Sequence, residues 1–189
     1  MLNNLSIKAR LIGSSVLAAG VIALLIAACI FILKDASRDM ESIYQERMVP
    51  SAALQSIDST LKDVRFRMSA YILDQMSPLG AKNHLTEARK QIPESWQVFR
   101  AGTQRNQLSS EEKEWISLVE TQINNLPALF DSIDQAYTKE DKETLTRIFA
   151  EDWLPVQKNI TKPMEKLLPK QQDAVKTAYE ENVAHGKKL

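Results

Sequence analysis

Hydrophobic positions divide this chain into two parts with different patterns. Residues 11–33 form an apolar run without a charged side chain, LIGSSVLAAGVIALLIAACIFIL. From residue 35 onward, hydrophobic residues instead recur every three or four positions among charged ones. The first pattern is typical of a membrane span, and the second is typical of amphipathic helices that bury one face.

The apolar run is long enough to cross a membrane. As a helix, its 23 residues extend about 35 Å, which exceeds the roughly 30 Å of hydrocarbon in a bilayer. Lys8 and Arg10 precede the run without any acid, whereas mixed charges follow it. The positive flank indicates a cytoplasmic N-terminus. We therefore predict a cytoplasmic segment at 1–10, a transmembrane helix at 11–34 and a periplasmic domain at 35–189, in the bacterial inner membrane with a single pass.

Two other interpretations of the apolar run stay open. A cleavable signal peptide has a shorter apolar core of about 7–15 residues. The stretch Ile26-Ala27-Ala28-Cys29 resembles the lipidation signal of bacterial lipoproteins, although the run stays apolar through residue 33. The sequence leaves undecided whether Cys29 carries a lipid.

Residues 35–189 predict four helices, at about 35–77, 81–101, 110–138 and 141–185. Ser109 and Glu112 form a capping box at the start of the third. Short turns follow the first and third helices, so neighbouring helices run antiparallel. We predict an all-α fold: an up-down-up-down four-helix bundle whose first helix continues from the transmembrane helix. The expected core positions are Leu54, Ile57, Leu61, Val64, Met68, Tyr71, Leu85, Ala88, Ile92, Trp96, Phe99, Ile116, Val119, Ile123, Leu126, Phe130, Ile133, Tyr137, Leu145, Ile148, Phe149, Trp153, Val156, Ile160, Met164 and Leu167.

Prolines interrupt the predicted helices at one level of the bundle. Counting back from the turns places Pro93, Pro127 and Pro155 about level with two arginines of the first helix, Arg65 and Arg67. Each proline removes a backbone donor and crowds the carbonyl four residues earlier. This predicts irregular packing with room for a ligand or for water. The alternative is that the prolines only bend the helices. Pro50 is expected to kink the first helix, and Pro155, Pro163 and Pro169 to make the fourth the most irregular.

The two arginines are candidate ligand-binding residues. Arg65 and Arg67 are about 200° apart around the helix, so their side chains point in different directions. A guanidinium group binds a carboxylate with two parallel hydrogen bonds. The alternative is that each arginine lies on the surface and pairs weakly with Asp63 or Asp58.

Aromatic residues give two further candidates and a predicted contact surface. Tyr71 and Trp153 are candidate ligand contacts, with core packing as the alternative. Phe66 and Leu73 lie on the side of the first helix opposite its core stripe. Such an apolar patch is expected to be covered. We predict a homodimer through the first helix, with chance exposure as the alternative.

Composition excludes several classes of function. The 189 residues include 24 basic and 24 acidic side chains, and this zero net charge argues against a nucleic-acid partner. One cysteine, two histidines and five glycines leave little for metal binding, phosphate binding or catalysis. His84 with Glu87 lacks the further ligands that a metal centre needs. We therefore expect no enzymatic activity, no metal and no cofactor.

The pattern resembles the four-helix-bundle ligand-binding domain of bacterial methyl-accepting chemotaxis receptors. The resemblance rests on the short basic start, the span at Leu11–Leu33, YQERMVP at 44–50 and DVRFRMSAY at 63–71. It implies a dimeric periplasmic domain that binds a small amino acid or organic acid through arginines of its first helix, and that shifts its last helix in response. Similar domains also head histidine kinases and diguanylate cyclases. A membrane-anchored helical module that binds a protein and no small molecule is a further alternative.

Overall fold

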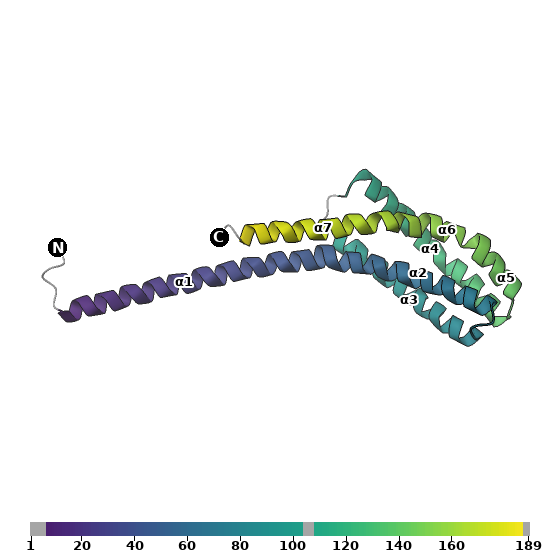
Figure 1. Ribbon diagram of the computed structural model, residues 1–189, viewed down its shortest axis with the longest axis horizontal. Helices are drawn as coiled ribbons and strands as arrows, with labels where there is room; N and C mark the ends of the chain where they lie inside the picture. The colour runs from purple at the N-terminus through teal and green to yellow at the C-terminus, as the bar shows by residue number, and fades with distance from the viewer. Residues whose placement is uncertain (1–6, 104–107, 187–189) are drawn as a thin grey trace. The chain divides into compact units, whose positions relative to one another are not determined.

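A computed structural model describes residues 7–103 and 108–186, and every regular element in these ranges is helical. The elements are α1 (Ile7–Ile43), η1 (Tyr44–Met48), α2 (Val49–Ile72), α3 (Pro78–Thr103), α4 (Ser110–Thr138), α5 (Lys142–Arg147), η2 (Ile148–Asp152), α6 (Leu154–Val156), η3 (Gln157–Thr161) and α7 (Lys162–Gly186), where η marks a π-helical segment (Figure 1). The predicted all-α class is confirmed.

The chain divides into two compact units, residues 1–42 with 182–189 and residues 43–181. In the first unit, Ile12–Lys34 of α1 is the one helical stretch in the described residues that is long and apolar enough to cross a membrane. Its side chains are exposed throughout. A surface this apolar is expected to be covered. The stretch coincides with the predicted transmembrane helix at 11–34.

The second unit is an antiparallel four-helix bundle. Contacts join α2 to α3, α3 to α4, α4 to the segments from α5 to η3, and these segments back to α2. In each pair of neighbouring helices, a residue that comes later in one helix contacts a residue that comes earlier in the other, so the two helices are antiparallel. The contacts are Thr60–Gln91 and Ser56–Ser95, Lys82–Thr138 and Arg100–Glu120, Gln122–Asn159 and Glu111–Lys170, and Asp74–Lys142 and Arg65–Phe149. This confirms the predicted up-down-up-down order.

The core contains the hydrophobic positions that the three-four spacing predicted. All of the expected core residues are buried except Phe149, which is half-buried. They form one continuous cluster. Burial of these side chains is the main favourable contribution to the stability of the bundle.

The turn between α2 and α3 differs in position from the predicted helix ends at 77 and 81. Asp74 has a φ of 59°, and the N–H of Gln75 donates to the carbonyl of Ala70 at 2.8 Å. This arrangement closes α2 with a Schellman-type cap. Pro78 then begins α3. The backbone N–H at this first helical position would have no partner within the helix, so a proline there costs no hydrogen bond. The cluster at 77–80 is therefore the start of a helix rather than the turn itself.

Side-chain caps begin α4 and α5. The Ser109 hydroxyl accepts from the N–H of Glu112 at 3.2 Å, and the Glu112 carboxylate accepts from the N–H of Ser109 at 2.9 Å. This confirms the predicted capping box of α4. At the start of α5, the Asp141 carboxylate accepts from the N–H of Thr144 at 3.0 Å and from its hydroxyl at 2.7 Å. These bonds lower the pKa of Asp141.

Each described π-helical segment lies just before a proline. η1 precedes Pro50, η2 precedes Pro155 and η3 precedes Pro163. The carbonyl that each proline crowds, four residues earlier, falls inside the π-helical segment. In η2, the N–H of Trp153 donates to the carbonyl of Ile148 at 2.9 Å, a bond across five residues. The fourth bundle helix therefore has the predicted irregularity at Pro155 and Pro163, whereas Pro169 lies inside α7 without a π turn.

Candidate functional site

The two candidate arginines on α2 contact different neighbours. The Arg65 guanidinium lies 4.7 Å from the ring centroid of Phe149 in η2. The Nε of Arg67 instead donates to an Asp63 carboxylate oxygen at 3.0 Å on the same helix. Their predicted divergence is therefore observed. Arg65 is half-buried, and no carboxylate in the described part of the chain pairs with it.

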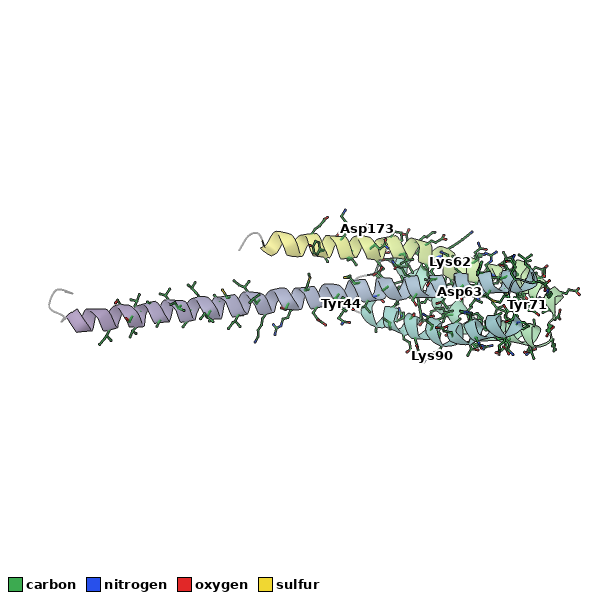
Figure 2. All side chains as sticks on the ribbon, turned by 60° about the horizontal axis from the view of Figure 1, so that its bottom comes forward. Tyr44, Lys62, Asp63, Tyr71, Lys90 and Asp173 are labelled. Carbon is green, nitrogen blue, oxygen red and sulfur yellow. The ribbon has the colours of Figure 1, made fainter. Side chains whose placement is uncertain are left out.

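Asp63 links α2 to α3. Its second carboxylate oxygen lies 3.5 Å from Nδ1 of His84, in a shallow polar groove between the two helices. Figure 2 shows Asp63 on α2 beside Lys62. Asp58, the other acid considered for the arginines, accepts from Lys62 at 2.6 Å, and this bond raises the pKa of Lys62. Among the described residues, no three potential metal-ligating side chains gather into a cluster.

Tyr71 and Trp153, the other two candidates, lie in the core. The Tyr71 ring packs edge-on against Tyr137 with centroids 5.2 Å apart, and Lys142 Nζ lies 5.7 Å from the Tyr71 centroid. Burial raises the pKa of Tyr137. Figure 2 shows Tyr71 toward the turn end of α2. Both candidate aromatic rings are almost fully covered by neighbouring helices.

A pocket lies at two of the three predicted proline positions. It has a volume of about 310 Å³ and lies between α3 and α4. Its lining is Ala88, Arg89, Ile92, Pro93, Ile123, Asn124, Leu126, Pro127 and Phe130. The four predicted site residues on α2 and near η2 do not line it. The sequence therefore predicted the space correctly but associated it with other side chains.

The third proline borders a different cavity. Pro155 and Leu154 line an open hollow with Lys158 and Lys162 on the outer side of the fourth helix. The three prolines that were predicted to lie at one level of the bundle therefore border two separate cavities. Arg89 was not among the predicted site residues, although its position four residues before Pro93 marks it as the residue whose carbonyl the proline disturbs.

The predicted apolar patch on α2 is exposed. Phe66 is 62% exposed and Leu73 is 64% exposed. Phe66 is adjacent in sequence to both candidate arginines. The outer face of α2 therefore carries uncovered apolar side chains.

Comparison with known families gives one match. The model of the Tar ligand binding domain homologue family (TarH) matches residues 1–175, which include α1 and most of the bundle. Comparison with curated proteins and with solved structures gave no match. Together with the candidate span in α1, the family match supports membrane insertion and a role in chemotaxis signalling. The chain belongs to the Tar ligand-binding domain family, and it is a chemoreceptor ligand-sensing domain.

Proposed function

We propose that this domain senses a small organic acid or amino acid in the periplasm by binding its carboxylate at Arg65. The observation that carries the proposal is the state of Arg65, a half-buried guanidinium without an acidic partner in the described residues. A half-buried charge is more stable when paired. A carboxylate is the geometric match for a guanidinium group. Arg67 points away from Arg65 and is held by Asp63, so the proposed contact does not include it.

The contact between Arg65 and Phe149 suggests how binding is relayed. Phe149 belongs to η2, and π-helical segments often mark positions where a helix changes register. A ligand carboxylate that draws Arg65 away from the Phe149 ring alters the surroundings of η2. We propose that this favours a second arrangement of the fourth helix and shifts it along its axis. Coupling of about 1–3 kcal/mol is typical for such a transition.

We further propose that two copies pair through α2 in the inner membrane. The exposed Phe66 and Leu73 support this pairing, and Lys8 and Arg10, which precede the apolar stretch of α1, support a cytoplasmic N-terminus. Phe66→Cys in membranes is expected to form an intermolecular disulfide on mild oxidation. Leu118→Cys on α4, also exposed, is the matched control and is expected to stay monomeric. Equal cross-linking at both positions would contradict pairing through α2.

Calorimetric titration tests the proposed carboxylate site. The full chain in lipid nanodiscs is titrated with a panel of amino acids and of mono- and dicarboxylic acids. We expect Arg65→Ala to weaken binding by about tenfold or more, because a charge-assisted hydrogen bond is lost. Arg147→Ala is the control, since Arg147 pairs at the surface with Asp152 at 2.7 Å, and binding should be unchanged. If every acid of the panel binds equally well to Arg65→Ala and to the parent chain, the site is refuted.

A further inference from the structure

We infer that the pocket between α3 and α4 is a second ligand site, which takes a small carboxylate with an apolar body and holds its anionic end at Arg89. The site is separate from Arg65 and does not depend on the function proposed above. The inference rests on the shape of the pocket, on its single cation among the described lining residues, and on its two prolines.

The pocket has an apolar floor of suitable size. Ala88, Ile92, Leu126 and Phe130 are buried in the core and form its base. The exposed Pro93 and Pro127 stand at its sides, one from each helix. A volume of about 310 Å³ is at the lower end of the range for small-molecule sites. The floor therefore suits a compact aromatic or branched aliphatic group.

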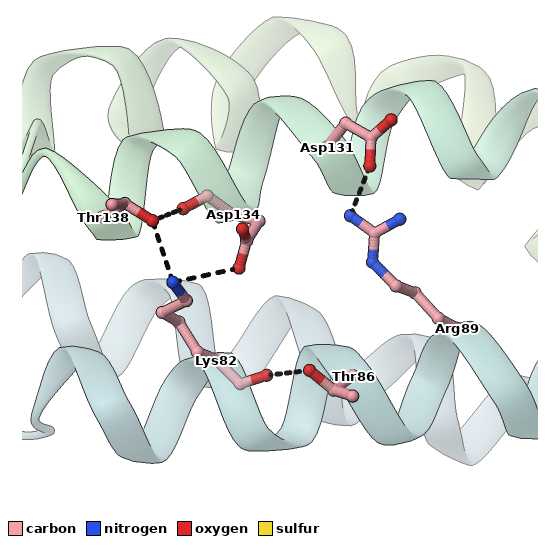
Figure 3. Close-up of polar contacts among 6 residues, drawn as sticks. All are labelled: Lys82, Thr86, Arg89, Asp131, Asp134 and Thr138. Atoms are coloured by element: carbon pink, nitrogen blue, oxygen red, sulfur yellow. Dashed lines mark hydrogen bonds and ion pairs between the residues drawn. The ribbon is translucent and has the colours of Figure 1, made fainter.

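Arg89 supplies the positive charge. Its guanidinium Cζ lies 5.9 Å from the Phe130 ring centroid, and its Nη2 lies 2.7 Å from an Asp131 carboxylate oxygen (Figure 3). None of the described residues that line the pocket is acidic. Asp131 is 63% exposed, so its ion pair with Arg89 is weak. A ligand carboxylate can replace Asp131 while its apolar body covers the floor.

The prolines remove the usual helical donor from two backbone carbonyls. Pro93 has no N–H for the carbonyl of Arg89, and Pro127 has none for the carbonyl of Ile123. Both of these residues line the pocket. Neither proline is associated with a π-helical segment. The ammonium group of an amino acid, or water beside a simple acid, can donate to these carbonyls.

A second set of contacts holds α3 against α4 without Arg89. Lys82 Nζ donates to the Thr138 hydroxyl at 2.9 Å and lies 3.5 Å from an Asp134 carboxylate oxygen (Figure 3). Arg100 lies 3.8 Å from Glu120 in the same interface. These pairs are expected to keep the helices together when Arg89 turns to a ligand. They also make Arg100 a matched control, because it bridges the same helices but does not line the pocket.

The test uses 3-phenylpropionate, phenylalanine and uncharged 3-phenylpropanol as probes of the full chain in lipid nanodiscs, with binding followed by ligand-observed NMR. Both carboxylates are expected to bind, and tighter binding of phenylalanine would assign its ammonium to the two carbonyls. Arg89→Gln should weaken binding about tenfold or more, whereas Arg100→Gln and Arg65→Ala should leave it unchanged. Asp131→Asn should strengthen binding, because it removes the competing carboxylate.

The opposite responses of the Arg89 and Asp131 variants separate ligand binding from a structural role. If Arg89→Gln and Asp131→Asn weaken binding equally, the pair only holds the helices and the inference is overturned. If 3-phenylpropanol binds as tightly as the carboxylates, Arg89 does not hold an anionic group. If no probe binds, the pocket is not a ligand site. If Arg65→Ala is the only variant that loses phenylpropionate binding, the ligand binds at Arg65 on α2 and not in the pocket. Circular dichroism of each variant confirms that the bundle is folded.

Discussion

The prolines of the middle helices and those of the fourth helix show two responses of a bundle to the same defect. In α3 and α4, Pro93 and Pro127 lie within α-helices and border an open pocket. In the fourth helix, Pro155 and Pro163 each follow a π-helical segment; the inward-facing residues beside them pack into the core, and an open hollow at Pro155 lies on the outer side of the helix. Trp153, Val156 and Ile160 are all buried there.

The two responses have different structural consequences. A π turn shifts the helical register, so the side chains beyond it regain contact with the core. A proline kept in an α-helix leaves the register unchanged and leaves space beside it. Under the two proposals above, the pocket of the middle helices holds one ligand, and the fourth helix shifts when another binds at Arg65.

The largest expected difference between the two regions is in how much a large-to-small core substitution lowers the free energy of unfolding. Ile160 in η3 is fully buried, so Ile160→Ala leaves an enclosed cavity and is expected to destabilise the bundle by about 4 kcal/mol. Ile123 is 6% exposed at the pocket, where water can enter, and Ile123→Ala should cost only about 2 kcal/mol. Urea unfolding of the full chain in detergent micelles measures both. Equal costs would mean that the pocket region is as closely packed as the fourth helix.

Pro50 extends the comparison to the start of the bundle. Its ring packs so closely on α3 that a Cβ at Gly102 would lie 2.2 Å from Pro50 Cγ. Neither a proline ring nor a helix backbone can move away easily, so Gly102→Ala is expected to cost about 2 kcal/mol. At Gly80 a new Cβ would meet its nearest atom at 3.4 Å. Gly80→Ala should therefore stabilise α3 slightly, by up to about 1 kcal/mol. Thermal unfolding measures both, and a neutral Gly102→Ala would show that η1 can shift.

Replacing the prolines themselves should give effects of opposite sign. Pro93→Ala restores the donor to the Arg89 carbonyl within a regular helix and is expected to stabilise the bundle by about 1 kcal/mol. Pro155→Ala permits η2 to return to α-helical register, which turns Trp153 and Val156 out of alignment with the following core positions. It is expected to be neutral or destabilising by about 1 kcal/mol. Urea unfolding gives the signs, and stabilisation by both variants would contradict the proposed role of the π turns.

Much of the fold follows from spacing along the sequence. The three-four pattern identified the four helices and their buried faces because burial of apolar area dominates bundle formation. The pattern did not locate the end of α2, which depends on the left-handed conformation of Asp74. The five-residue difference between the predicted end at 77 and the observed end at Ile72 arises from such local geometry, which residue type alone specifies weakly.

The candidate site was less accessible to sequence reasoning. The prolines indicated where space would occur. Which side chain faces that space depends on the rotation of each helix about its axis, and on whether the helix accommodates its proline with a π turn or leaves a gap beside it. The sequence predicted that Arg65 and Arg67 diverge but not that Arg65 is the one beside the fourth helix, and Arg89 was not considered. Tyr71 and Trp153 share a stripe with core residues, and hydrophobic spacing does not separate a core ring from a ligand contact.

The smallest predicted effect concerns the caps that begin the two regions. α4 begins at Ser109, and α5, which starts the fourth helix, begins at Asp141 with hydrogen bonds from Thr144. These bonds lower the pKa of Asp141 from its ordinary value of 3.8. A lowered pKa in the folded state means that the cap stabilises α5 at pH values above 3.8 and loses this contribution as the pH falls through the lowered value. Asp141→Asn keeps a capping side chain but cannot titrate. Its stability relative to the parent chain should therefore rise as the solution is acidified through that range, as measured by thermal unfolding. A pH-independent difference would show that Asp141 is protonated or uncapped in solution, and that the fourth helix begins without a charge-assisted cap.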